Sequence, residues 1–328
     1  MFKGTKMNVG VVGAGSFGTA ISQIIALNVE EVILYSRRKK IAEDINKNSV
    51  NNEYYPNYKL NNKIRAVNSL KDLKECEVIF ITVPSSGFRK TLEEMKNEGI
   101  NDSILVTASK GIEPISSATM GQIIQEYYND KYVVVSGPNF ASEVVLNLPT
   151  VTNIASNSKN NLNIVKKILE TEFFKVEEID DVIGLEYCGI LKNINAVANG
   201  ICEGIQINEN GRYAILTKGF NENKKIVESI GGKPSTIDEY CGFGDIILTS
   251  ISKQSRNHTL GVLIGQKLEI NKGHGVVFEG KNSVKTIKEI CDKKCLDCKI
   301  VNFVYDVLVN KEVAKTAFKN LWKNITMK

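Results

Sequence analysis

Lys192 is the residue of this sequence whose surroundings most clearly suggest chemistry. Its neighbours at helical spacing, among them Leu185, Cys188, Gly189 and Ala196, are mostly apolar or small. Its amine is therefore expected to be partly buried. Burial disfavours the ammonium form and moves the pKa of a lysine towards neutrality, where the amine can transfer protons. The alternative, which fits most lysines, is a side chain that reaches the surface or pairs with an acid.

A glycine-rich turn near the N-terminus, Gly13-Ala14-Gly15-Ser16-Phe17-Gly18, matches the pattern G-x-G-x-x-G. It follows an apolar run typical of a strand and opens a helical pattern, the context in which this short motif has meaning. Gly13 would permit the tight turn, Gly15 would leave room for a pyrophosphate, and Gly18 would let the helix pack on the strand. The helix N-terminus would offer N–H groups to the phosphates. The turn therefore predicts dinucleotide binding; the alternative is a connection without a ligand.

Two arginines follow the second predicted strand, which ends Leu34-Tyr35-Ser36-Arg37-Arg38. An NAD-selective site usually has Asp or Glu at this place to bind the ribose 2′-hydroxyl, whereas an arginine accommodates a 2′-phosphate. Arg37 and Arg38 therefore favour NADP(H), or acceptance of both NADP and NAD. The alternative is that they are solvated charges after a strand.

Further polar clusters stand where an apolar core does not need them. Two follow predicted strands, where doubly wound folds bind ligands: 108–113, with Lys110, and 136–141. A third is 191–193, around Lys192. A fourth is 242–245, which ends in Asp245 and is followed ten residues later by 255–257. Asp245 could also simply cap the following helix.

The elements that must position these residues divide the chain into two parts. Short apolar runs alternate with helical patterns in the first part, which predicts an α/β, Rossmann-like, doubly wound domain over residues 1–184. From residue 185 to 328 helical patterns dominate, the longest over 185–205, so the second domain is expected to be mostly α-helical. The expected strands lie at 9–12, 31–35, 64–67, 78–83, 103–107 and 132–136, with 152–155 and 174–177 as candidates that extend the sheet.

Composition excludes several classes of protein. The 328 residues are 42% hydrophobic and 24% charged, and the formal net charge of +5 comes without a basic run or interleaved aromatic residues. This argues against nucleic-acid binding. No segment has the length and apolarity of a membrane span. The seven cysteines are an odd number in a long chain, which indicates reduced thiols and a cytoplasmic protein.

The ordered motifs resemble the bacterial-type NAD(P)-dependent glycerol-3-phosphate dehydrogenase family over nearly the whole chain. Eight segments carry the resemblance: 13–20, 83–85, 109–111, 136–143, 191–193, 242–245, 255–257 and 277–280. The resemblance implies reversible hydride transfer between sn-glycerol 3-phosphate and NAD(P)+, which gives dihydroxyacetone phosphate and supplies glycerol 3-phosphate for phospholipid synthesis. It also implies a homodimer, a small phosphorylated substrate and no metal.

The same resemblance implies roles for matching positions. Lys192 would be the proton acceptor, with Asp245 beside it. The substrate would be lined by Lys110, Gly137, Asn139, Ser255, Arg256 and Asn257. The cofactor would be met by Ser16, Phe17, Arg37, Lys110, Ala141, Arg256, Val277 and Glu279. Of these, Arg256 is the best candidate for the substrate phosphate, because charge-assisted bonds from an arginine suit a dianion.

Some features depart from the family pattern or leave alternatives. Gly211-Arg212-Tyr213 is bulkier than usual, Lys218 replaces an arginine, and Asn139 stands where Ser or Thr is common. Cys291, Cys295 and Cys298 could supply three zinc ligands, but ordinary thiols fit better. The rival functions are a reductase of 3-hydroxy acids or ketopantoate and a regulator that senses NADP(H) without chemistry.

Overall fold

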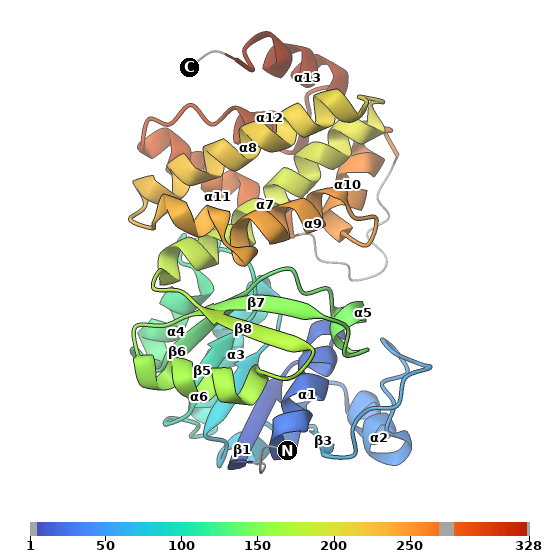
Figure 1. Cartoon of the computed structure of the whole chain (residues 1–328), viewed down its shortest axis with the longest axis vertical. Coiled ribbons are helices and arrows are strands. Elements are labelled where there is room, and N and C mark those ends of the chain that lie inside the picture. The colour runs from blue at the N-terminus through green and yellow to red at the C-terminus, as the bar shows by residue number, and fades with distance from the viewer. Residues whose placement is uncertain (1–4, 269–278, 327–328) are drawn as a thin grey trace. The chain divides into compact units, whose positions relative to one another are not determined.

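The protein consists of two compact units, seen in a computed structural model that describes residues 5–268 and 279–326 (Figure 1). The first unit comprises Met1–Ser109 and Met120–Val182. The second comprises Lys110–Thr119 and Ile183–Lys328. The domain boundary predicted from the sequence, at residue 184, would place the short segment 110–119 in the nucleotide-binding domain. Its contacts place it with the helical half instead, and this segment carries Lys110.

The first unit is built on one eight-stranded sheet with the order β3-β2-β1-β4-β5-β6-β7-β8. The order 3-2-1-4-5-6 is that of a dinucleotide-binding fold, so the predicted Rossmann-like class is confirmed. Neighbouring strands are parallel except β6 and β7, which run antiparallel. The connection between these two contains only the four-residue helix α5 (Ala141–Val144). The strands are β1 (Thr5–Val12), β2 (Val29–Tyr35), β3 (Ile64–Val67), β4 (Val78–Ile81), β5 (Ile104–Thr107), β6 (Tyr132–Ser136), β7 (Thr150–Ala155) and β8 (Phe174–Glu178).

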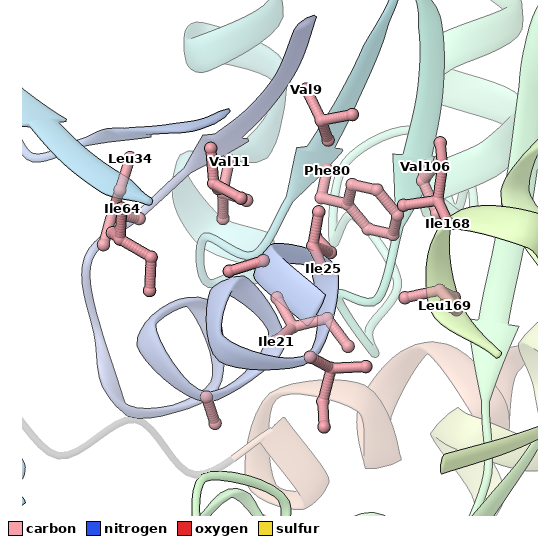
Figure 2. Close-up of a cluster of buried hydrophobic side chains, with 14 of the residues drawn as sticks. Val9, Val11, Ile21, Ile25, Leu34, Ile64, Phe80, Val106, Ile168 and Leu169 are labelled. Atoms are coloured by element: carbon pink, nitrogen blue, oxygen red, sulfur yellow. The ribbon is translucent and has the colours of Figure 1, made fainter. Parts of the chain in front are cut away.

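Helix α1 (Ser16–Asn28) packs on this sheet through an apolar face. Ile21 and Ile25, one helical turn apart, lie against strand side chains that include Val11 and Phe80 (Figure 2). All four are at most 1% exposed. Burial of an aliphatic or aromatic side chain of this size stabilises the fold by about 1.5–3 kcal/mol. The other helices of the unit, besides α5, are α2 (Lys39–Asn48), α3 (Phe88–Asn97), α4 (Met120–Tyr128) and α6 (Lys159–Leu169).

The second unit is α-helical apart from a short hairpin. Its central helix, α7 (Val182–Gly204), is buried from Gly184 to Cys202, as expected of a helix with apolar or small residues on all sides. A π-helical turn, Tyr240–Gly244, leads into α9 (Asp245–Ile251). The remaining helices are α8 (Glu209–Ser229), α10 (Arg256–Gly265), α11 (Glu279–Lys293), α12 (Lys299–Leu308) and α13 (Ala314–Lys323). None of the helices in the described residues is long and apolar enough to cross a membrane.

Candidate functional site

The second unit holds one buried carboxylate between two lysines. The Nζ atom of Lys192 lies 2.6 Å from both carboxylate oxygens of Asp245. The Nζ atom of Lys110 lies 3.0 Å from Oδ2 of the same carboxylate. The side chains are 9%, 2% and 18% exposed for Lys192, Asp245 and Lys110, respectively. The structure thus brings together the three charged residues that the sequence singled out from distant segments.

This environment changes the proton affinity of both partners. Burial lowers the pKa of Lys192 to about 7, with a further lowering from the Lys110 cation, although the charge of Asp245 acts in the opposite direction. Burial alone would raise the pKa of Asp245, but the two lysine cations outweigh it, so that the pKa is lowered. At neutral pH the carboxylate is therefore ionised and the Lys192 amine can take up or release a proton.

Local backbone geometry fixes the position of Asp245. A Cβ atom on Gly242 would lie 2.3 Å from the carbonyl oxygen of Ile237, so only glycine permits this close approach of the π-helical turn. The hydroxyl of Thr249, one turn along α9, donates to Oδ1 of Asp245 at 3.1 Å. Asp245 begins α9, but its carboxylate binds lysines and does not cap the helix. No sequence pattern predicted the contribution of Thr249.

The cluster 255–257 lies at the start of α10. Ser255 is the N-cap residue, whose Oγ accepts a hydrogen bond from the backbone N–H of His258 at 3.2 Å. Arg256 is exposed and has no hydrogen-bond or ion-pair partner among the described residues. Its guanidinium can therefore meet an anion without first leaving a partner in the described part of the chain.

Asn257 joins α10 to the first turn of α11. Its Oδ1 accepts from the backbone N–H of Gly280 at 3.2 Å. A Cβ atom on Gly280 would lie 2.8 Å from the carbonyl oxygen of Asn193, the residue after Lys192. The start of α11, where Glu279 lies, is thus packed against α7. The other predicted residue of this segment, Val277, lies outside the described residues.

The glycine-rich turn of the first unit has the geometry that its sequence predicts. Gly13 adopts a φ of +112°, a conformation that side chains rarely permit, and Gly15 has open space where a Cβ would stand. A Cβ on Gly18 would lie 1.8 Å from the carbonyl oxygen of Gly13. Helix α1 then begins at Ser16 and Phe17 without a side-chain cap, so its first N–H groups can bind phosphate. The residues present fit a dinucleotide.

Three residues that the sequence did not single out support this turn. The Thr82 hydroxyl, just after β4, binds the carbonyl oxygens of Val12 and Gly13 at 3.0 Å each. The fully buried Asn51 donates to the Ala14 carbonyl at 3.1 Å. The Tyr55 hydroxyl donates to the Ser16 carbonyl at 3.0 Å. These contacts arise between segments distant in sequence, so no local pattern signals them.

The structure distinguishes the two arginines after β2. The guanidinium of Arg38 lies 2.5 Å from a carboxylate oxygen of Glu53 and 3.1 Å from the hydroxyl of Tyr54. Arg37 is exposed and has no such partner within the described part of the chain. The two residues are therefore not equivalent in their capacity to bind a phosphate.

The cluster after β6 belongs to the first unit. A Cβ on Gly137 would lie 2.8 Å from Cα of Thr152 in β7, so glycine is required where the two strands separate. Asn139 and Ala141 follow and are partly buried. They lie at the carboxyl end of a strand of the sheet, where doubly wound folds bind ligands.

The cysteine cluster gives no metal site in the residues that the structure describes. Cys291 and Cys298 are buried and Cys295 is exposed, and all three are free thiols. Cys298 precedes the first residue of α12, and the segment that carries Cys295 and Cys298 connects α11 to α12.

A dinucleotide-binding sheet followed by a helical unit with a buried lysine–aspartate pair defines the class of nicotinamide-dependent dehydrogenases. Residues 8–162 match the NAD-dependent glycerol-3-phosphate dehydrogenase N-terminus, and residues 181–319 match the C-terminus of the same family. The chain belongs to the NAD-dependent glycerol-3-phosphate dehydrogenase family.

Individual relatives agree with this assignment. A glycerol-3-phosphate dehydrogenase (NAD(P)+) from Clostridium botulinum (strain Alaska E43 / Type E3) is 35% identical, over 95% of this chain and 96% of the relative. One from Methanothermobacter thermautotrophicus is 36% identical, over 93% and 94%. The crystal structure of glycerol-3-phosphate dehydrogenase from Coxiella burnetii superposes with a TM-score of 0.91 at 30% identity, and covers 97% of this chain and 99% of that one.

Proposed function

We propose that the protein catalyses the reversible oxidation of sn-glycerol 3-phosphate by NAD(P)+ to dihydroxyacetone phosphate and NAD(P)H. The observation that carries this proposal is the contact of Lys192 with both carboxylate oxygens of Asp245 at 2.6 Å, buried inside the helical unit of a chain of this family. In the cell the product of the reverse direction would supply phospholipid synthesis.

Lys192 is the proton acceptor of the proposed reaction. Oxidation of a secondary alcohol requires a base for the hydroxyl proton at C2 while the nicotinamide nucleotide takes the hydride from the same carbon. A lysine whose pKa is lowered to about 7 has both protonation states within reach at neutral pH. The neutral amine serves oxidation, and the ammonium returns the proton to the ketone oxygen in reduction.

Asp245 and Lys110 set the position and the proton affinity of the Lys192 amine. The carboxylate fixes the Lys192 amine by two contacts and stabilises the ammonium that forms. The Lys110 ammonium contacts Oδ2 of the same carboxylate at 3.0 Å. With substrate bound, this ammonium would also stabilise negative charge that develops on the reacting oxygen in the transition state.

The substrate phosphate needs fixed positive donors, and α10 offers them at its N-terminus. Arg256 supplies the charge and the helix start supplies N–H groups and a favourable dipole. The Ser255 hydroxyl accepts from the N–H of His258, and its own proton can still be donated to a phosphate oxygen. Asn257 contributes its amide N–H groups while its oxygen binds Gly280.

The cofactor is bound mainly by the first unit. Gly13, Gly15, Gly18, Ser16 and Phe17 would hold the pyrophosphate. Arg37, which is exposed and has no partner within the described residues, would bind a 2′-phosphate, so NADPH is favoured over NADH. Arg38 stands beside Arg37 as a second candidate for the 2′-phosphate. The family resemblance implies further cofactor contacts at Lys110, Ala141, Arg256, Val277 and Glu279, and substrate contacts at Gly137 and Asn139.

The proposed role of Lys192 is tested by Lys192→Ala. The variant should lose turnover by a factor on the order of 10² to 10⁴ or more, because positioned acid–base help contributes that much to rate. Binding of NADPH, followed by its fluorescence, should survive. Unchanged turnover with dihydroxyacetone phosphate would remove Lys192 from the mechanism. Absence of turnover in the unaltered protein with either reduced cofactor would favour a nucleotide-sensing regulator.

We further propose a homodimer that works in the cytoplasm, with residues 1–184, apart from the segment 110–119, serving cofactor binding and 185–328 serving catalysis. Large apolar side chains stand exposed on the second unit, among them Phe243 (52%) and Tyr213 (50%), as on surfaces that meet a partner. All seven cysteines are free, which suits a reducing compartment. Light scattering of the purified protein would test the dimer.

A further inference from the structure

Residues 110–119 form a hairpin that belongs to the helical unit, although both flanking segments belong to the nucleotide-binding unit. Its two arms pair through an antiparallel bridge between Ile112 and Thr119. The N–H of Glu113 donates to the carbonyl of Ala118 at 2.9 Å. The base of the hairpin is buried, with Ile112 1% and Thr119 2% exposed, while Ile115 at the tip is 97% exposed. The hairpin is therefore anchored at its base.

Each arm of the hairpin base makes a side-chain contact with another residue of the helical unit. On one arm, Lys110 reaches Asp245, which also binds Lys192 of α7. On the other arm, the Thr119 hydroxyl donates to Oε2 of Glu186 at 2.6 Å. Glu186 lies on α7 six residues before Lys192 and is 9% exposed. The contacts thus form a closed ring that begins and ends on α7.

We propose that Thr119 and Glu186 are positioning residues, which fasten the hairpin 110–119 to α7 and thereby hold the Lys110 ammonium on the Asp245 carboxylate. This inference rests on the proposed function and extends it to two residues that contact neither substrate nor cofactor. The bridge to Thr119 lies only two residues from Lys110, about 6.6 Å along an extended strand. A fixed Thr119 leaves Lys110 little freedom to leave the carboxylate.

The position of the Lys110 ammonium matters because its charge affects the proton affinity of Lys192. The groups that act on its amine are the Asp245 carboxylate and the Lys110 ammonium, and the latter lowers the pKa of Lys192. A hairpin released from α7 would let Lys110 move into solvent. The Lys192 amine would then hold its proton more tightly, and oxidation, which needs the neutral amine, would require a higher pH.

The test compares Thr119→Val, which removes the hydroxyl and keeps the volume, with Thr119→Ser, which keeps the hydroxyl. In Thr119→Val, kcat for oxidation should fall about tenfold, the equivalent of one buried hydrogen bond to a carboxyl group. The acid limb of its pH profile should move upward by about half a unit to one unit, the scale of a Coulomb interaction partly lost near a protein surface. Thr119→Ser should restore both.

A double-mutant cycle separates positioning from a general structural role. If Thr119 acts through Lys110, Thr119→Val should change neither kcat nor the acid limb in a Lys110→Met background. Effects that multiply independently, or a normal pH profile in Thr119→Val, would overturn the proposal. Ser116→Ala, on the exposed tip of the same hairpin, is the matched control and should behave as the unaltered protein. A failure of the proposed function itself differs, because the unaltered protein would then lack turnover with glycerol 3-phosphate.

Discussion

At the scale of single residues, Lys192 experiences two opposed influences on its proton affinity. Removal from water and the nearby Lys110 cation favour the neutral amine, whereas the Asp245 carboxylate favours the ammonium. The result is a pKa of about 7, near which a base can work in either direction of a reversible reaction. The same carboxylate that orients the amine therefore also limits how far its pKa can fall.

This balance predicts the pH dependence of the reaction. Oxidation of glycerol 3-phosphate should rise as pH increases through about 7, because the neutral form of Lys192 is the base, and reduction should fall over the same range. In Asp245→Asn the ammonium loses its partner, so the pKa of Lys192 should drop further and the acid limb of oxidation should move to lower pH. The substrate phosphate, which titrates near pH 6, is unchanged by this variant. An acid limb that stays in place would assign it to the phosphate.

Arg256 gives a prediction about substrate recognition. In Arg256→Ala, kcat/KM for dihydroxyacetone phosphate should fall about 10- to 100-fold, because a hydrogen bond to a charged group is worth about 1.5–3 kcal/mol. Activity with phosphate-free dihydroxyacetone should change little. Lys253→Ala, an exposed lysine three residues earlier, is the matched control. Equal losses with both ketones would show that Arg256 serves the cofactor or the fold instead of the substrate phosphate.

At the scale of elements, the junction of α8 and α12 depends on a buried acid. Both carboxylate oxygens of Glu222 accept backbone N–H groups at the start of α12, from Ile300 and Val301, at 3.0 Å each. Burial nevertheless raises the pKa of Glu222 to about 7 from its ordinary 4.5. The carboxyl group therefore joins two helices, and its proton affinity is higher in the folded protein than in the unfolded chain.

Stability should consequently decrease as pH rises from about 4.5 to about 7. The folded protein binds this proton more tightly than the unfolded chain, so the contribution is complete at low pH and disappears once pH exceeds the folded-state pKa. At about 1.4 kcal/mol per pKa unit, the loss is on the order of 3 kcal/mol. Glu222→Gln should flatten this slope in the unfolding midpoint, and Glu228→Gln, exposed on the same helix, should leave it. The same slope in both variants would contradict the assignment.

The helices and strands show which parts of the fold local sequence patterns can predict. Continuous apolar runs such as 78–83 predicted strands at their observed places. The long helical pattern over 185–205, mostly of apolar and small residues, predicted α7, because burial on all sides leaves a local signature. The antiparallel direction of β7 and the helix α8, whose residues are mixed in polarity, have no such signature. The pairing of Lys192 with Asp245 was expected from resemblance, whereas the contact of Lys110 with Asp245 was not. Asn51, Thr82 and Thr119 likewise act through contacts distant in sequence.

At the scale of the whole molecule, the two units divide the chemistry. In the proposed mechanism the sheet unit supplies the phosphate-binding turn, and the helical unit supplies the proton acceptor and the exposed Arg256. The hairpin 110–119 is the exception to this division, since it leaves the sheet unit in sequence and joins the helical unit in contacts. The sequence alone does not predict that this hairpin joins the helical unit, because its two arms are too short to show a hydrophobic pattern.

Cofactor preference can be measured through the stability of the whole chain, since a ligand that binds only the folded state stabilises it by about 2.7 kcal/mol at a hundred times its Kd. If Arg37 binds the 2′-phosphate, NADPH should raise the unfolding temperature more than NADH at equal concentration. Arg37→Ala should remove the difference by weakening NADPH alone. Lys39→Ala, with a side chain 77% exposed two residues on, is the matched control. A preference for NADPH that persists in Arg37→Ala would transfer the role to Arg38, which would first have to leave Glu53.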